Sequence, residues 1–316
     1  MRSNPIAYGE PVFFKGKYKE DKLYNLYVQQ IVCRFKIKKN KIPTIQIKSK
    51  GSLFIPTEYL TDSGPDPVPL VLTSIDLKLF FEQYDVSDLQ YIAGWKFKSV
   101  KGLFTEYIDK WTKEKIEAGK EGNKGKRTLA KLMLNSLYGK LATCLNATPK
   151  VPYILDDGIV RYKLGEPETK KGIYIPAAAF ITAYAREKTI RTAQAITDYS
   201  IKKYGKDMFI YSDTDSIHTL LPIEELTQFC EIDDYELGYW AHEASFDKAV
   251  FIRSKCYAEF IDGNLDITCS GMPPACYPYV TFENFKVGFS LLASDNNIDH
   301  KLTYKHVKRW SATCRN

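Results

Sequence analysis

The sequence lacks the cysteine and histidine patterns of a disulfide-rich or zinc-binding protein. Its 316 residues include seven cysteines and four histidines, with no CxxC pair and no histidine at zinc spacing from a cysteine. We therefore expect neither disulfides nor structural zinc. Long apolar runs are absent too, because the longest uncharged stretch of note, residues 172–185, contains Pro176 and is too short to span a membrane. Polar residues rather than an apolar run follow Met1, so we expect no signal peptide and an intracellular protein.

The chain has only a mild excess of positive charge. The 45 Lys and Arg residues against 38 Asp and Glu give +7, which suits a nucleic-acid partner but also many unrelated proteins. Residues 34–50 hold seven of these cations and no acid. Apolar Cys33, Phe35 and Ile37 alternate with basic residues there, which predicts a strand with one basic face. That face is suited either to a phosphate backbone or to an edge strand kept soluble by lysines.

Two carboxylates spaced i, i+2 lie between two short apolar runs in Phe209-Ile-Tyr-Ser-Asp-Thr-Asp-Ser-Ile-His218. This pattern predicts a hairpin: residues 209–211 form the first strand, residues 216–220 form the second, and short polar side chains lie at the turn. Asp213 and Asp215 would then project beside each other at the tip. Carboxylates this close repel unless a cation neutralises them, and hard oxygen ligands suit Mg²⁺ or Mn²⁺. An ordinary Asp-rich turn is the alternative that this stretch leaves open.

A helical segment upstream, predicted from Arg127 to Thr143, presents one polar stripe. Arg127, Lys131, Asn135 and Tyr138 fall at i, i+4, i+8 and i+11. Two cations, an amide and an aromatic ring are suited to hold a nucleotide by its phosphates and its sugar or base. A solvated basic face is the alternative. The opposite side is expected to pack, and it comprises Leu129, Leu132, Met133 and Leu137.

These two stretches together resemble motifs B and C of the family B DNA polymerases, in order and in separation. The first is Lys-x-x-x-Asn-Ser-x-Tyr-Gly at residues 131–139, and the second is Tyr-Ser-Asp-Thr-Asp-Ser at residues 211–216. A narrower resemblance is to the protein-primed polymerases of small phages and linear plasmids. It depends on Tyr8-Gly-Glu-Pro11, Gly102-Leu-Phe104, Ile108-Asp-Lys-Trp-Thr112, Thr182-Ala-Tyr-Ala-Arg186, Leu237-Gly-Tyr-Trp-Ala-His-Glu243, Lys255-Cys-Tyr257 and Thr281-Phe-Glu-Asn-Phe-Lys-Val-Gly-Phe289.

The third motif of that family, motif A, is an Asp followed by Ser-Leu-Tyr-Pro, and it has no counterpart here. Residues 1–11 resemble its trailing edge, and Asp76 lacks the Tyr-Pro continuation. The acidic motifs of the family's proofreading exonuclease are also missing. The resemblance therefore implies a carboxyl-terminal half, whose palm would lack one carboxylate of the two-metal mechanism.

The resemblance implies an α+β fold with the right-hand core of these polymerases and two β-rich insertions. Local patterns agree: residues 1–101 read as strand-rich, and helices are expected over residues 104–118, 127–143 and 177–199. The implied divisions are 1–102 (palm edge and first insertion), 103–143 (fingers), 144–175 (second insertion, a β-hairpin), 176–269 (palm with the metal hairpin) and 270–316 (thumb and carboxyl-terminal tail).

The resemblance also implies roles for individual residues. Asp215 is the first choice for a catalytic metal ligand, with Asp213 beside it and Mg²⁺ or Mn²⁺ as the cofactor. Lys131 would neutralise the triphosphate, and Asn135 and Tyr138 would shape the base-pair pocket. The remaining implied contacts are Lys115 to the nucleotide and Ser136, Gly139, Thr182, Arg186, Lys255 and Tyr257 to DNA.

Two of these assignments depend on local structure. Lys255 and Tyr257 are expected to alternate on a strand, so that both face the primer terminus. Arg186 has a structural salt bridge as its alternative role.

The implied partners are template and primer DNA, dNTPs, a priming (terminal) protein and a separate amino-terminal polymerase half, in the cytoplasm of a bacterial host. A different class of protein stays open: a non-catalytic DNA-binding remnant of a polymerase. A reverse transcriptase is disfavoured, because those enzymes lack the pattern of residues 131–139.

Overall fold

The computed structural model describes residues 2–46, 59–292 and 309–312. They belong to two compact units, one of residues 1–38 and 62–188 and the other of residues 39–61 and 189–316. Both contain helices and antiparallel strand pairs, which agrees with the predicted α+β class. Among the described residues, no helix combines the length and the apolar character needed to cross a membrane.

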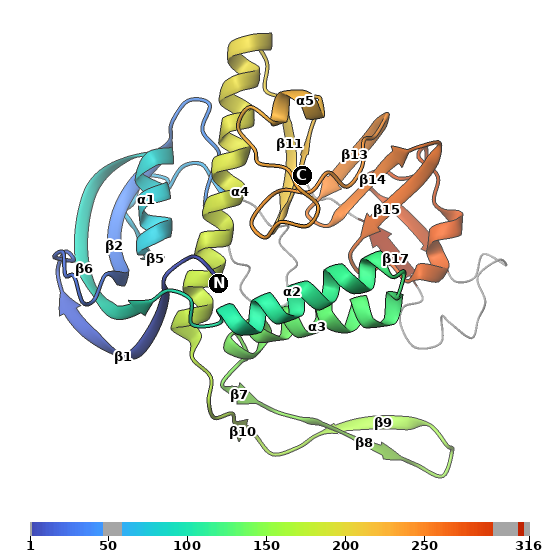
Figure 1. Cartoon of the computed structure of the whole chain (residues 1–316), viewed down its shortest axis with the longest axis horizontal. Coiled ribbons are helices and arrows are strands. Elements are labelled where there is room, and N and C mark those ends of the chain that lie inside the picture. The colour runs from blue at the N-terminus through green and yellow to red at the C-terminus, as the bar shows by residue number, and fades with distance from the viewer. Residues whose placement is uncertain (1, 47–58, 293–308, 313–316) are drawn as a thin grey trace. The chain divides into compact units, whose positions relative to one another are not determined.

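A four-stranded antiparallel sheet organises the first unit (Figure 1). Its order is β1 (Ile6–Lys15), β6 (Tyr84–Val100), β2 (Leu26–Ile37) and β5 (Val68–Thr73). The predicted alternation in β2 is confirmed, because Cys33 is buried and Arg34 is exposed. Strand β2 has β6 on one side and β5 on the other over residues 28–33, whereas the basic stretch 34–37 pairs with β6 and meets the other side through the isolated bridge Lys36–Asp62.

Helix α1 (Ser74–Gln83) packs against this sheet, although the sequence prediction for this region was strand-rich and named no helix. Thr73 caps the helix by accepting a hydrogen bond from the Asp76 N–H. Its buried Phe80 meets Phe35 of the sheet edge to face, with ring centroids 5.3 Å apart. Strands flank this short helix directly on both sides, so no Gly- or Pro-rich loop marks its ends in the sequence.

Helices α2 (Thr105–Lys120) and α3 (Lys124–Leu141) form an antiparallel pair (Figure 1). Both predicted helices are confirmed, and α3 begins three residues earlier than expected because Asn123 caps it, accepting from the Lys126 N–H. Ala130 is buried, whereas Leu129 and Leu132 are 52% and 61% exposed. The predicted packing of these two leucines is therefore wrong.

The packed stripe of α3 is rotated relative to the prediction. The buried or half-buried positions are spaced i, i+3, i+4 and i+7, and they are Ala130, Met133, Leu134 and Leu137. The Tyr107 hydroxyl on α2 donates to the Met133 carbonyl at 2.9 Å, which fixes the contact between the helices. Ala130 is buried, and a single partner helix leaves the flanking leucines uncovered.

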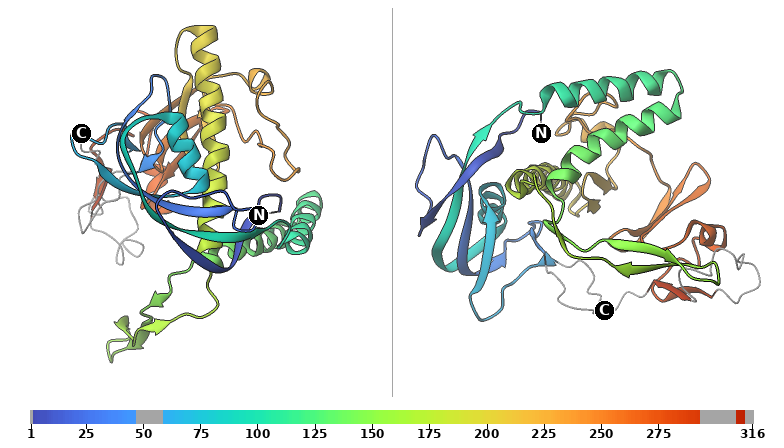
Figure 2. Two further views of the ribbon diagram at one scale, coloured as in Figure 1. Left: turned by 90° about the vertical axis from the view of Figure 1, so that its left-hand side faces the viewer. Right: turned by 90° about the horizontal axis from the view of Figure 1, so that it is seen from below.

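The predicted β-hairpin between residues 144 and 174 is confirmed. Strands β8 (Lys150–Ile154) and β9 (Val160–Leu164) pair antiparallel, and β7 (Asn146–Ala147) pairs with β10 (Glu168–Thr169) at its base. Figure 1 and the left view of Figure 2 show the hairpin projecting beyond the α2–α3 pair. Every residue of β8 is exposed, so the hairpin has no core of its own.

Helix α4 (Ile175–Tyr204) is the predicted long helix, extended at both ends. Its first half belongs to the first unit, where buried Phe180 meets Phe97 with ring centroids 5.9 Å apart. Its second half belongs to the second unit, where it anchors the segment that follows Lys38.

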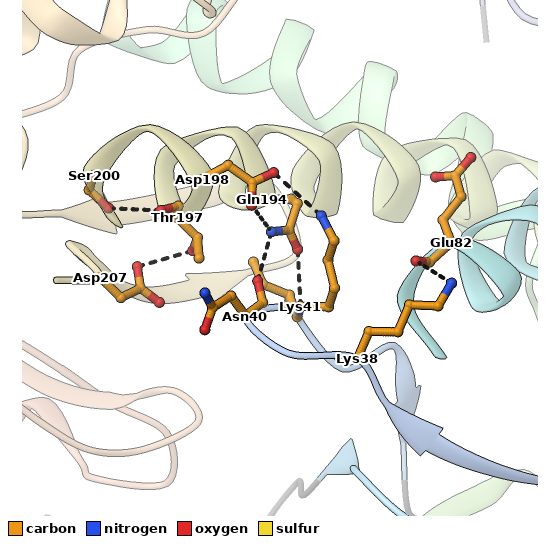
Figure 3. A network of polar contacts seen from close by, with 10 residues as sticks. Lys38, Asn40, Lys41, Glu82, Gln194, Thr197, Asp198, Ser200 and Asp207 are labelled. Atoms are coloured by element: carbon orange, nitrogen blue, oxygen red, sulfur yellow. Dashed lines mark hydrogen bonds and ion pairs between the residues drawn. The ribbon is translucent and has the colours of Figure 1, made fainter. Parts of the chain in front are cut away.

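Gln194 makes that anchor (Figure 3). Its side-chain amide accepts from the Ile42 N–H at 3.1 Å and donates to the Asn40 carbonyl at 2.9 Å. The Lys41 ammonium pairs with Asp198 one turn further along α4. Gln194 thus satisfies the backbone of a segment more than 150 residues away, and Asp198 on the same helix adds an ion pair with the Lys41 side chain.

The second unit also contains the hairpin β11 (Phe209–Asp213) and β12 (Ser216–Thr219) and a three-stranded antiparallel sheet. The sheet order is β13 (Lys248–Arg253), β14 (Cys256–Ile261) and β15 (Asn264–Cys269). The smaller elements are the pairs β3 (Ile45–Gln46) with β4 (Tyr59–Leu60) and β16 (Phe289–Leu292) with β17 (Arg309–Ala312), the short helix α5 (Ile223–Leu226) and the 3-10 helix η1 (Pro274–Tyr279). Most of the expected carboxyl-terminal tail lies outside the described residues.

Candidate active site

The hairpin predicted for the acidic motif is confirmed. Asp213 ends β11 and is paired in register with Ser216, the first residue of β12. Thr214 between them has φ 54°, and the Asp215 N–H donates back to the Asp213 carbonyl at 2.6 Å. This tight turn puts one carboxylate at the end of the strand and the other at the exposed tip.

Asp213 and Asp215 have different surroundings. The Lys255 ammonium lies 2.9 Å from the Asp213 carboxylate, which is 20% exposed. The hydrogen bond to Asp213 raises the pKa of Lys255 above its usual value, so the lysine is charged. Asp215 is exposed, and no residue in the described part of the chain forms an ion pair with it. A cation of the protein thus neutralises one carboxylate and leaves the other available.

The expectation that Lys255 and Tyr257 alternate on one strand is wrong. Lys255 lies in the two-residue turn between β13 and β14, at φ 55°, and only Tyr257 is in a strand. The cause is the Tyr211 hydroxyl, which accepts the Lys255 N–H at 2.9 Å and holds the turn beside β11. This position lets the Lys255 side chain reach Asp213 of the same unit.

The donor chemistry of the hairpin fits one side of a Mg²⁺ or Mn²⁺ site. Asp215 offers a free carboxylate and Asp213 a second one within the same turn, and both metals prefer such oxygen ligands. Among the described residues, no group of three or more Asp, Glu, His or Cys side chains could hold a metal ion. Waters, substrate phosphates or another carboxylate would have to complete the shell.

A buried polar pair that the sequence prediction missed supports the hairpin. His218 on β12 and Glu259 on β14 meet at 2.8 Å, and their side chains are 13% and 9% exposed. Rings of Tyr211, Phe251 and Tyr257 surround His218, with centroids 5.0–5.6 Å away. The pair and the rings join the acidic hairpin to the three-stranded sheet.

The polar stripe of α3 lies where the sequence predicted it. Arg127, Lys131 and Asn135 are exposed on one line, and Tyr138 is half-buried one turn further on. Neither Lys131 nor the half-buried Lys115 of α2 has an ion-pair partner within the described ranges. Two lysines without an ion-pair partner in the described chain, one on each helix of the pair, can bind phosphates.

Ser136 and Gly139 also lie on α3. A Cβ at Gly139 would meet no atom within 4 Å, so packing inside the described structure does not require glycine there. The Ser136 hydroxyl donates to the Leu132 carbonyl at 2.6 Å, within its own helix. Gly139 therefore leaves an open place on α3 that a partner can approach.

Thr182 and Arg186 lie one turn apart on α4, as predicted, and both have partners within the protein. The Thr182 hydroxyl donates to the Ala179 carbonyl at 2.9 Å. Arg186 donates from Nε and Nη2 to the two oxygens of Asp76, at 3.0 and 2.9 Å. The structure thus contains the salt bridge that was the alternative role for Arg186.

Comparison with known proteins agrees with these observations. A family model for DNA polymerase type B, organellar and viral, matches residues 1–224. The DNA polymerase of Bacillus phage Nf is 44% identical over 92% of this chain, and that of Streptococcus phage Cp-1 is 38% identical over 91%. This chain covers 51% and 50% of those two proteins, about half of their length.

A solved structure is similar as well. Phi29 DNA polymerase in complex with primer-template DNA and incoming nucleotide matches with a TM-score of 0.80 and 42% identity, covering 92% of this chain and 52% of that one. These matches confirm the resemblance based on residues 131–139 and 211–216 and the fold that it implied. The chain belongs to the organellar and viral type B DNA polymerases.

Proposed function

We propose that this chain carries the nucleotidyl-transfer site of a DNA-directed DNA polymerase, with Asp215 as the first metal ligand. One observation carries the assignment: Lys255 neutralises Asp213, while Asp215 is exposed without an ion-pair partner in the described chain. A divalent ion held at this tip, when bound, would neutralise developing charge on phosphate oxygens. The resemblance gives the same choice of Asp215.

The α2–α3 pair would bind the incoming dNTP. Lys131, with Lys115 as a second cation, would contact the triphosphate, and Asn135 and Tyr138 would shape the space for the new base pair. Tyr138 would also exclude ribonucleotides by crowding the 2′ position of the sugar. The reaction joins the α-phosphate to a primer 3′-hydroxyl, or to a hydroxyl of a priming protein during initiation, and releases pyrophosphate.

The expected divisions belong to the same proposal. Residues 103–143 would be fingers, 176–269 palm and 270–316 thumb, with residues 1–102 and 144–175 holding the insertions of the protein-primed branch. Ser136, Gly139, Thr182, Arg186, Lys255 and Tyr257 are the proposed DNA contacts. To contact a DNA phosphate, the Arg186 guanidinium would have to keep only part of its contact with Asp76 or leave Asp76 altogether.

A second candidate is DNA binding without catalysis by this polypeptide alone. It is favoured by the ligand chemistry of the hairpin, because within the described residues no third Asp, Glu, His or Cys side chain joins Asp213 and Asp215 in a group that could hold a metal ion. An amino-terminal polymerase half supplied as a separate chain would restore the missing carboxylate in that case.

Primer extension separates the two candidates. The 316-residue chain is incubated with primed DNA, dNTPs and Mg²⁺, beside an Asp215→Asn chain and an Asp66→Asn control at an exposed loop carboxylate. Extension that is lost in Asp215→Asn and retained in Asp66→Asn supports the proposal. DNA binding by all three chains without extension supports the non-catalytic candidate, and equal extension by all three contradicts the role of Asp215.

A further inference from the structure

Two buried cysteines meet beside the Lys255 turn. Cys256 begins β14 and Cys269 ends β15, and the two residues lie directly opposite in the antiparallel register. Their Sγ atoms are 3.3 Å apart, and the residues are 0% and 4% exposed. Opposite residues of paired strands project from the same face, so both thiols point into one apolar core. The proposed polymerase chemistry uses neither of them.

The register makes this pair suitable for a covalent link. The Ser270 N–H donates to the Lys255 carbonyl at 2.7 Å, so the ladder bonds flank the cysteines and the two residues form a non-hydrogen-bonded pair. The Cα atoms of such pairs are about 4.5 Å apart, at the short end of the range that disulfides span. The sulfurs would need to approach from 3.3 Å to the ~2.0 Å of a disulfide.

We propose that Cys256 and Cys269 form a reversible intrachain disulfide when the protein meets a peroxide. The Cys256 thiolate attacks one peroxide oxygen, the O–O bond breaks, and a sulfenic acid and water form. The Cys269 sulfur then attacks the sulfenic sulfur, and a second water leaves as the S–S bond forms. Two thiols thus lose two electrons and two protons, and hydrogen peroxide becomes two waters.

The contact between the thiols favours Cys256 as the attacking thiolate. The hydrogen bond between the two sulfurs lowers the pKa of the Cys256 thiol, and it raises that of Cys269. Access comes from the end of β15, an outer strand of its three-stranded sheet. Cys269 is the last residue of this strand, and Ser270 and Gly271 beyond it are exposed. Fraying of a strand end is the kind of local opening that admits a reagent as small as peroxide.

Closure would act on Lys255, because that residue precedes Cys256. The Lys255 N–H binds the Tyr211 hydroxyl, its carbonyl binds Ser270 and its ammonium binds Asp213. Because the Cα atoms of such a pair are already at the short end of the disulfide range, closing the sulfurs from 3.3 Å would shift the ends of β14 and β15, displace this turn and weaken the Lys255–Asp213 pair. An effect on catalysis would rest on the proposed function, whereas the disulfide and the displaced turn do not.

Mass-spectrometric mapping tests the link in the full 316-residue chain. After hydrogen peroxide treatment and alkylation of remaining thiols, we expect a peptide joining Cys256 to Cys269 that dithiothreitol removes. Exposed Cys144 serves as an internal control, because its oxidation shows that peroxide acted. Oxidised Cys144 without the Cys256–Cys269 peptide would overturn the proposal.

Variants and hydrogen exchange test the mechanism and its consequence. In Cys269→Ala no resolving thiol remains, so we expect oxidation of Cys256 to be slower, because its hydrogen bond with Cys269 is lost, and to stop at a sulfenic acid that dimedone traps. Cys33→Ala, at a buried thiol of the first unit, keeps the link. If Cys269→Ala does not fold, the mapping of the natural chain decides. In the oxidised chain we expect amide exchange of residues 255–257 to rise severalfold, and unchanged exchange would overturn the effect on the Lys255 turn.

Discussion

At the scale of single residues, the chemistry of the candidate site depends on the partner that each acid contacts. Lys255 pairs with Asp213, and Glu259 pairs with His218 behind the hairpin. Neither pairing could be read from the sequence, because both join β11 or β12 to the separate sheet of β13 to β15. One sequence signal did point to the Glu259–His218 pair. Glu259 follows Tyr257 by two positions, so both side chains face the same side of β14.

The buried pair makes a testable contribution to stability. In Glu259→Ala, His218 loses the partner of its Nδ1, and its Nε2 already has no partner among the described residues. We expect a loss of about 2 kcal/mol in the free energy of unfolding, and less than about 1 kcal/mol in Glu259→Gln, which retains a hydrogen-bond acceptor. Urea denaturation measures both, with exposed Glu236→Ala as a control expected to change stability by less than about 0.5 kcal/mol. Equal losses in the two Glu259 variants would contradict the pairing.

At the scale of elements, helices α2, α3 and α4 and the hairpins were predictable because each has a strong local period or turn. The packing of α3 was not, because which apolar stripe is covered depends on the partner helix rather than on α3 itself. Leu129 and Leu132 were assigned to the core and are exposed, while small Ala130 is buried. Helix α1 was missed for a similar reason, since its ten residues lie directly between two strands.

Gly139 in α3 allows a prediction that separates folding from binding. A Cβ would meet open space there, so Gly139→Ala should raise the free energy of unfolding by about 0.5 kcal/mol through lower backbone entropy. We also expect it to weaken binding of dNTP and primer-template DNA, measured by fluorescence anisotropy.

Gly125→Ala is the matched control for that variant. Gly125 is an exposed glycine of the same helix, and its Cβ would make only an ordinary contact with the Asn123 side chain, at 3.7 Å. It should stabilise the chain without weakening binding. Unchanged binding in Gly139→Ala would refute a role for this glycine at the interface.

The Arg186–Asp76 salt bridge predicts energetic coupling between α4 and α1. Both oxygens of Asp76 accept from the guanidinium, and Asp76 also binds the Thr73 cap of α1. A double-mutant cycle with Arg186→Ala and Asp76→Ala should give a coupling energy of about 1 kcal/mol in urea denaturation. Additive losses would show that Arg186 does not act through Asp76 and would favour a DNA contact alone.

At the scale of the whole molecule, motif order and spacing identified the family and the α+β class, and the matches to phage DNA polymerases confirm both. The division into two units was not predictable, because the described residues that follow Lys38 belong to the second unit and are held there by Gln194 on α4 (Figure 3). A hydrophobic pattern reports only local structure, so it does not predict that residues after Lys38 contact a helix more than 150 residues away.

We expect a divalent ion to bind at Asp215 when DNA and nucleotide are present. Electron paramagnetic resonance measures Mn²⁺ bound to the chain with primer-template DNA and a non-hydrolysable dNTP, for the natural sequence and for Asp215→Asn and Asp66→Asn. We predict that Asp215→Asn weakens Mn²⁺ binding at least about tenfold, a loss of about 1.4 kcal/mol, and that Asp66→Asn leaves it unchanged. Equal Mn²⁺ binding by all three chains would contradict this expectation.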